Sequence, residues 1–290
     1  MPEYFSPSKI NLYLNIKGKR PDGYHELETL MIPLELGDTM VIEESDSTIS
    51  MTCNSPEVPC DERNLVWKAI KALHEVKPEA AGRGVKVHLE KRTPVAAGMG
   101  GGSANAATAI RALNDIYRLN LSIVEQESIV NKVGSDCAFF IKNLPALCTG
   151  RGEIIQSLPL NLDFYIIIIN PGFGISTKWS YETLSKTKVP AAPPVEKLIN
   201  AINENDIKNT QPYLFNSLEF PAFEKYLILP QIKNDLISFG SDSAMMSGSG
   251  STVFALCRDK AAADEVLNKI KSKYGKIIFG QVTKPLSSIV

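Results

Sequence analysis

The feature that most constrains the fold of this chain is a glycine-rich segment at residues 94–107, PVAAGMGGGSANAA. Four of the five residues from 98 to 102 are glycine, and glycine can adopt positive φ while leaving space for a ligand beside the main chain. Ser103 is a suitable N-cap, so a helix is predicted from Ala104 onward. A glycine loop that leads into a helix presents unpaired N–H groups and a partial positive charge. The segment therefore predicts a phosphate-binding loop.

Two well-known phosphate loops do not fit this segment. A P-loop requires a lysine after its second glycine, and none follows here. A dinucleotide fingerprint requires a third glycine where Ser103 stands, soon after the first strand of the fold. A flexible surface loop before a capped helix is the plainer alternative, although four glycines exceed what a cap requires.

Composition excludes several classes of protein. The 290 residues, 44% hydrophobic and 22% charged, are typical of a soluble globular protein with one large domain or two tightly joined ones. Lys and Arg number 31 against 32 Asp and Glu, so no excess of positive charge indicates a nucleic-acid partner. The longest apolar run, residues 164–169, is too short to span a membrane, and the N-terminus lacks the layout of a secretory signal. Five scattered cysteines and three histidines favour free thiols in the cytoplasm over a zinc site.

Strand and helix patterns alternate along the chain. Apolar residues at every second position over 10–16 predict a half-buried strand, with Lys9 and Asn11 on its other face. Further strands are predicted at 40–44, 85–90, 164–169, 252–257 and 276–282, and helices at 65–73, 123–133, 194–203, 230–239 and 260–273. The mixture predicts an α+β protein.

The pattern P-x-x-x-G-[LM]-G-G-G-S-x-x-A-A resembles the phosphate loop of the GHMP kinases, which bind ATP through backbone amides and lack a P-loop lysine. Residues 6–30, SPSKINLYLNIKGKRPDGYHELETL, resemble the opening of the members of that family that act on 4-diphosphocytidyl-2-C-methyl-D-erythritol. Residues 134–140, GSDCAFF, and 245–256, MMSGSGSTVFAL, resemble two further family segments. The pairing of K-I-N with R-P-D-G-Y-H is the most specific of these, because other GHMP kinases lack it.

The resemblance implies a two-lobed GHMP kinase fold with the active site in the cleft between the lobes. Residues 1–160 would form an ATP-binding lobe like a domain of a small-subunit ribosomal protein, and residues 161–290 a ferredoxin-like, substrate-side lobe. The implied reaction is ATP-dependent phosphorylation of the 2-hydroxyl of 4-diphosphocytidyl-2-C-methyl-D-erythritol, giving the 2-phosphate and ADP, on the non-mevalonate route to isoprenoid precursors. The implied assembly is a monomer or weak homodimer.

Asp136 is the candidate catalytic base, because it follows a predicted helix end and precedes an apolar segment. In the family, the matching aspartate accepts the proton of the substrate hydroxyl beside a lysine that matches Lys9. That lysine would keep the carboxylate ionised and stabilise the moving phosphoryl charge. A purely structural ion pair between Asp136 and Lys9 is the alternative. Cys137 and Ala138 stand where the family more often has valine and proline.

The resemblance also implies the ATP contacts. They are Asn64 and Lys91 for adenosine, and Pro94, Ala96, Gly98, Gly100, Gly101, Gly102, Ser103 and Ala104 for the phosphates. No carboxylate stands out as a dedicated metal ligand, so Mg²⁺ is expected to be held largely by ATP oxygens and water. Residues 247–251 are expected to form a turn against the phosphate loop. Met99 replaces the more usual leucine, a mild change.

The substrate contacts implied by the resemblance form a cytidine site. His25 would hydrogen-bond the base, Tyr24 and Tyr181 would stack on its two faces, and Asn11 and Thr177 would add polar contacts. A tyrosine at 181, where phenylalanine is usual, is also typical of a packing residue. A GHMP kinase for homoserine, mevalonate or a sugar would not need this site, and a non-catalytic nucleotide-binding or RNA-binding module would need neither Lys9 nor Asp136.

Overall fold

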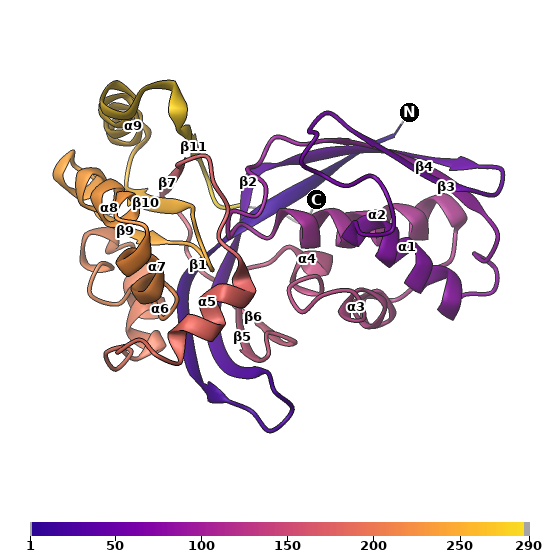
Figure 1. Ribbon diagram of the computed structural model, residues 1–290, viewed down its shortest axis with the longest axis horizontal. Coiled ribbons are helices and arrows are strands. Elements are labelled where there is room, and N and C mark those ends of the chain that lie inside the picture. Colours follow the sequence, from indigo (N-terminus) through magenta and orange to yellow (C-terminus); the bar gives the residue numbers. More distant parts are fainter. Residues whose placement is uncertain (1, 287–290) are drawn as a thin grey trace.

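The computed structural model describes residues 2–286, which form two β-sheets with helices on their outer faces (Figure 1). The strands are β1 (Glu3–Lys19), β2 (His25–Ser45), β3 (Ile49–Cys53), β4 (Gly84–Glu90), β5 (Ala146–Gly150), β6 (Ile154–Ser157), β7 (Tyr165–Asn170), β8 (Phe215–Asn216), β9 (Ser243–Met246), β10 (Val253–Cys257) and β11 (Phe279–Thr283). The α-helices are α1 (Leu65–Val76), α2 (Gly101–Tyr117), α3 (Ile123–Asn131), α4 (Phe139–Lys142), α5 (Thr177–Leu184), α6 (Val195–Asn203), α7 (Glu219–Lys225), α8 (Ile228–Ser238) and α9 (Lys260–Tyr274). The predicted α+β class and two-lobed arrangement are confirmed.

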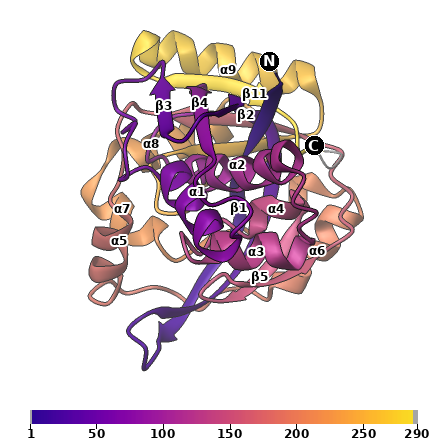
Figure 2. The ribbon, with the colours of Figure 1, turned by 90° about the vertical axis from the view of Figure 1, so that its right-hand side faces the viewer.

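The first sheet has seven strands and is built on the long β1–β2 hairpin. Its order is β3-β4-β2-β1-β8, with β5 also paired to β2 and β6 to β5. Strand β2 is long enough to pair with β5 near its start and with β4 near its end. Figure 2 shows α1 to α4 gathered on the face of this sheet that is turned to the viewer.

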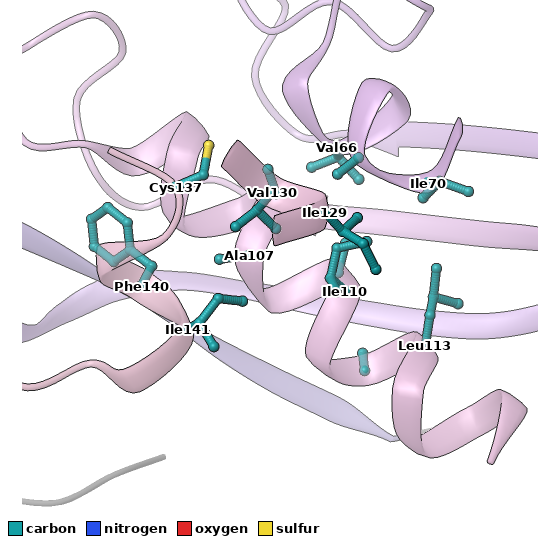
Figure 3. Close-up of a cluster of buried hydrophobic side chains, with 14 of the residues drawn as sticks. Val66, Ile70, Ala107, Ile110, Leu113, Ile129, Val130, Cys137, Phe140 and Ile141 are labelled. Carbon is teal, nitrogen blue, oxygen red and sulfur yellow. The ribbon is translucent and has the colours of Figure 1, made fainter. Parts of the chain in front are cut away.

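Helix α2, which follows the phosphate loop, is held by a large apolar cluster. Figure 3 shows its residues Ala107, Ile110 and Leu113 among side chains from α1, α3 and α4. Ile110 and Leu113 are fully buried. Since the packing fixes α2 on several sides, it also fixes the direction in which its N-terminus points.

The second sheet has the antiparallel order β11-β7-β10-β9. Strand β7 carries an unbroken isoleucine run because both of its faces are buried. Ile166 and Ile168 belong to the same apolar cluster as Ile10 of β1, so the two sheets share a buried core. Ile167 packs on the opposite side with apolar residues of α8 and α9.

The alternation predicted for β1 is correct up to Leu12 and then breaks. Lys9 and Asn11 share a face, as predicted, but that face is buried too, so the half-buried strand predicted here is wrong for residues 6–14. The pairing with β2 is irregular between Asn11 and Tyr13. Such an irregularity shifts the strand by a residue, so Tyr13 rather than Leu14 joins the cluster that contains Ile10.

Several predicted boundaries are corrected by the structure. The predicted N-cap at Ser103 is wrong: α2 begins at Gly101, Gly100 is its cap residue with φ of 69°, and Ser103 lies inside the first turn. Glycine takes this left-handed conformation without the steric cost that serine would incur. The strand predicted at 40–44 is the end of the much longer β2, and the one predicted at 276–282 begins only at Phe279.

Two predictions drawn from composition can be compared with the described residues 2–286. No helix among them combines the length and apolar character that crossing a membrane requires. The five cysteines all lie in this range and are free thiols.

Candidate active site

A cleft of about 570 Å³ contains the phosphate loop and most of the predicted site residues. The predicted residues that line it are Lys9, Asn11, Asn64, Lys91, Pro94, Ala96, Gly98, Gly100, Gly101, Gly102, Ser103, Asp136, Thr177 and Tyr181. Three predicted residues lie outside this lining. Ala104 is buried behind the loop and its N–H donates to the Gly100 carbonyl over 2.9 Å. His25 is the first residue of β2, and Tyr24 directly precedes it.

The phosphate loop is held by its carbonyl groups. The Lys9 N–H donates to the Met99 carbonyl over 2.9 Å, and the Thr252 N–H donates to the Ala97 carbonyl over 3.3 Å. In the part of the chain that the structure describes, no backbone acceptor pairs with the N–H groups of residues 98–103. The first N–H groups of any helix lack partners within it. The loop therefore offers free N–H groups at the N-terminus of α2, as an anion site requires.

The predicted contact between the phosphate loop and the turn at 247–251 is confirmed. The Ser247 hydroxyl donates to the Gly98 carbonyl over 2.9 Å. Gly98 has φ of +77°, and a Cβ placed on it would lie 2.1 Å from the Ser247 carbonyl oxygen. Only glycine allows two backbones to approach this closely.

Lys9 lies at the base of the loop. Its Nζ donates to Asn11 Oδ1 over 2.5 Å and to the Gly98 carbonyl over 2.9 Å, and its side chain passes beneath Gly100. Burial lowers the pKa of Lys9, and the negative charge of Asp136 opposes that effect. The cation is thus held beside the loop by neutral oxygen atoms.

Asp136 lies between α3 and α4, where its charge reaches several groups of the cleft. Burial raises the pKa of Cys148 to about 12 and also raises that of Tyr181, and Asp136 adds to both effects. No ion pair within 4.0 Å joins Asp136 to Lys9. The two residues therefore form neither the structural ion pair of the alternative nor the direct contact that the resemblance implies, and Asp136 acts on Lys9 only through its charge.

Two of the residues predicted to bind cytidine are in direct contact, whereas Tyr24 contacts a residue outside the predicted set. The rings of His25 and Tyr181 lie 4.9 Å apart with an angle of 38° between their planes. Tyr24 is 53% exposed and faces the Arg151 guanidinium at 4.6 Å. Burial, followed by the charge of Lys19, lowers the pKa of His25, which favours the neutral form of its imidazole.

The remaining predicted residues are fixed by local contacts. Asn64 caps α1 by accepting from the Val66 N–H over 2.9 Å, and it donates to the Pro59 carbonyl over 2.6 Å. Thr177 opens α5 and its hydroxyl lies 3.2 Å from the Ser249 hydroxyl. Asn64 therefore has a structural use as well as a place in the cleft.

Sequence patterns missed two residues that orient this site. Thr29 accepts from Asn11 Nδ2 over 2.8 Å and donates to the Tyr13 carbonyl over 2.7 Å, so it fixes the Asn11 amide. Asp38 is 1% exposed and pairs with Lys91 over 2.6 Å. Asp38 could have been recognised because it is a carboxylate within a long apolar strand. A buried carboxylate needs a cation or hydrogen-bond donors around it.

Comparisons with known proteins agree with this arrangement. Residues 64–143 match the GHMP kinases N terminal domain and residues 196–276 match the GHMP kinases C terminal domain. The chain is 39% identical over 267 residues to a 4-diphosphocytidyl-2-C-methyl-D-erythritol kinase of Clostridium beijerinckii, covering 92% of this chain and 95% of that one.

Solved structures show the same similarity. A crystal structure of 4-(cytidine 5'-diphospho)-2C-methyl-D-erythritol kinase superposes with a TM-score of 0.82 at 29% identity, over 98% of this chain and 100% of that one. A homoserine kinase from Cytophaga hutchinsonii, 17% identical, superposes with a TM-score of 0.73 over 98% of this chain and 94% of its own, and so shares the fold.

Proposed function

Because this chain belongs to the GHMP kinase family, we propose that it transfers the γ-phosphoryl group of ATP to the 2-hydroxyl of 4-diphosphocytidyl-2-C-methyl-D-erythritol. The products are ADP and the 2-phosphate, on the non-mevalonate route to isoprenoid precursors. The observation that carries this proposal is the similarity, over 92% of this chain, to a relative named 4-diphosphocytidyl-2-C-methyl-D-erythritol kinase. It is combined with one cleft that holds a phosphate loop, Lys9 and Asp136.

The chemistry proposed for the cleft is an in-line transfer. The substrate oxygen forms a bond to the γ-phosphorus while the bond from that phosphorus to the β,γ-bridging oxygen breaks, and the electron pair of that bond stays on ADP. The hydroxyl proton passes to the Asp136 carboxylate. Lys9 stabilises the charge on the transferring group, and the free N–H groups of residues 98–103 bind the phosphates.

Magnesium is proposed to enter with ATP. The cleft offers the Ser103 hydroxyl and the Asp136 carboxylate, and residues 2–286 contain no group of three or more His, Cys, Asp and Glu placed to hold an ion. This donor set fits an ion that keeps most of its contacts to phosphate oxygens and water, as Mg²⁺ does. Magnesium bound in this way neutralises phosphate charge.

The acceptor is proposed to bind through its cytosine. Tyr181 supplies a stacking ring from the lining of the cleft, and Tyr24 would supply a second ring, which faces Arg151 in this structure. His25 would bond the base edge, and Asn11 and Thr177 would add polar contacts. The ring centroids of His25 and Tyr181 lie 4.9 Å apart. This supports a cytosine site at these two residues, because a polar ring and an aromatic ring lie side by side there. Residues 1–160 are proposed as the ATP-binding part and 161–290 as the substrate-side part of a cytoplasmic monomer or weak homodimer.

The test is ADP release by purified protein with ATP and magnesium. The acceptors are 4-diphosphocytidyl-2-C-methyl-D-erythritol, homoserine, mevalonate and galactose, with a control that contains no acceptor. We expect turnover with the cytidylyl compound alone. Turnover with another acceptor alone would overturn the proposed substrate and the cytidine site, and failure of all four in folded protein that binds ATP would overturn the kinase function itself.

A further inference from the structure

Asp38 is a buried carboxylate with more hydrogen-bond donors around it than an ordinary ion pair supplies. Its Oδ1 accepts from the Arg92 N–H over 2.9 Å, from the Thr93 N–H over 3.0 Å and from the Thr93 hydroxyl over 2.9 Å. Its Oδ2 accepts from Lys91 Nζ over 2.6 Å and from Asn105 Nδ2 over 3.1 Å. The carboxylate therefore joins β2, the segment after β4 and helix α2.

Lys91 is the link between this network and the phosphate loop. A Cβ placed on Gly101, the first residue of α2, would lie 2.8 Å from Lys91 Nζ and 3.7 Å from Asp38 Oδ2. The Lys91 ammonium thus lies against the first turn of α2, and Lys91 also lines the cleft. Thr93 accepts from the same ammonium over 2.5 Å, which fixes its position from a second side.

This position is electrostatically unfavourable for a lysine unless a carboxylate accompanies it. The N-terminus of a helix carries a partial positive charge, which repels a cation. The Lys91 side chain is only 7% exposed, so water offsets little of that repulsion. Asp38 supplies the negative charge that keeps the ammonium there.

We propose that Asp38 is a positioning residue for ATP: it holds the Lys91 ammonium against the first turn of the phosphate-loop helix. This inference rests on the proposed ATP-dependent function. Asp38 acts on the nucleotide through Lys91 and does not act on the acceptor. Lys9, the cation assigned to the transfer step, meets the loop at Gly98 and Gly100 instead.

The first experiment compares Asp38→Asn with the unaltered protein. Asparagine keeps the shape and one oxygen for Arg92 and Thr93, but it loses the negative charge that faces Lys91. We expect the dissociation constant for ATP, measured by calorimetry without acceptor, to rise about tenfold or more. The KM for the acceptor should stay within about twofold.

A double-mutant cycle separates positioning from general support of the fold. If Asp38 acts through Lys91, then Asp38→Asn combined with Lys91→Met should bind ATP as weakly as Lys91→Met alone. Effects that multiply in the double variant, or equal rises in the KM of both substrates, would overturn the proposal. If Asp38→Asn does not fold, Lys91→Met is tested alone. An unchanged ATP affinity of that variant would overturn the proposal.

The matched control is Asp235→Asn in the second lobe. Asp235 is also buried, pairs with Lys273 over 2.7 Å and lies outside the lining of the cleft. This variant should lower the melting temperature and leave ATP binding unchanged. If the wild-type protein does not bind ATP, the proposed function is refuted. If the wild type binds ATP and Asp38→Asn binds it equally well, only the role of Asp38 is refuted.

Discussion

Replacement of Gly98 by alanine is expected to separate the phosphate loop from the turn at 247–251. The new Cβ would lie 2.1 Å from the Ser247 carbonyl oxygen and 3.0 Å from the Gly250 nitrogen, and both are backbone atoms that cannot rotate away. Alanine at φ of +77° also costs about 1–2 kcal/mol. Separation breaks the bonds of Ser247 to the Gly98 carbonyl and of Thr252 to the Ala97 carbonyl, about 0.5–1.5 kcal/mol each. We therefore expect a loss of about 2–5 kcal/mol in the free energy of unfolding.

The same loop contains a matched control for this substitution. Gly102 lies in α2, its φ is not positive, and a Cβ there would meet only Leu65 Cδ1 at 3.5 Å. Because alanine is the better helix residue, Gly102→Ala should raise the free energy of unfolding by about 0.5–1 kcal/mol. Urea unfolding of both variants, together with ATP titration of Gly98→Ala, provides the measurement. The packing argument fails if Gly98→Ala keeps wild-type stability and ATP affinity, or if Gly102→Ala is the more destabilised of the two.

Three further predictions concern the chemistry of the cleft. Asp136→Ala should lower kcat by a factor of about 10²–10⁴ while ATP binding stays near normal. If titration and circular dichroism show that ATP binding and folding are lost together, Asp136 has a structural role. Tyr181→Ala should raise the KM for the cytidylyl substrate by the equivalent of about 1–3 kcal/mol, and an equal rise in the KM for ATP would contradict stacking on cytosine. Burial lowers the pKa of Lys9 below its ordinary value of 10.5, so the unfolded chain binds this proton more strongly. The wild type should therefore gain stability relative to Lys9→Met as the pH rises from the lowered pKa toward 10.5, and urea unfolding curves that run parallel across that range would refute the lowered pKa.

Local patterns predicted those parts of the site that depend on backbone conformation. The glycine loop and the strand that carries Lys9 and Asn11 lie where their local patterns placed them, and the turn against the loop lies where the family resemblance placed it. Glycine content and two-residue alternation act over a few neighbouring residues, so they can be recognised without knowing the rest of the fold. The face on which the Lys9 side chain lies follows from its position on the strand.

The parts that escaped prediction depend on contacts between distant residues. Asp38 bonds to Thr93 and Asn105, which are 55 and 67 positions away in sequence, and no motif links them. The start of α2 was misplaced because serine is the better cap by propensity, whereas the left-handed backbone at Gly100 decided the boundary. The contact between Tyr24 and Arg151 arises from the turn between β5 and β6, which sequence patterns did not place near Tyr24.

A phosphate loop without its own lysine must obtain positive charge from other elements, and here two lysines supply it differently. Lys91 is paired with the Asp38 carboxylate, so part of its charge beside Gly101 is compensated. Lys9 is bonded to the neutral oxygens of Asn11 and Gly98, so its charge is not cancelled by a directly bonded carboxylate. An uncompensated cation in a buried site interacts more strongly with a developing negative charge than a paired one does. The charge of the loop is therefore concentrated near Gly98 and Lys9, the end at which the transfer is proposed to occur.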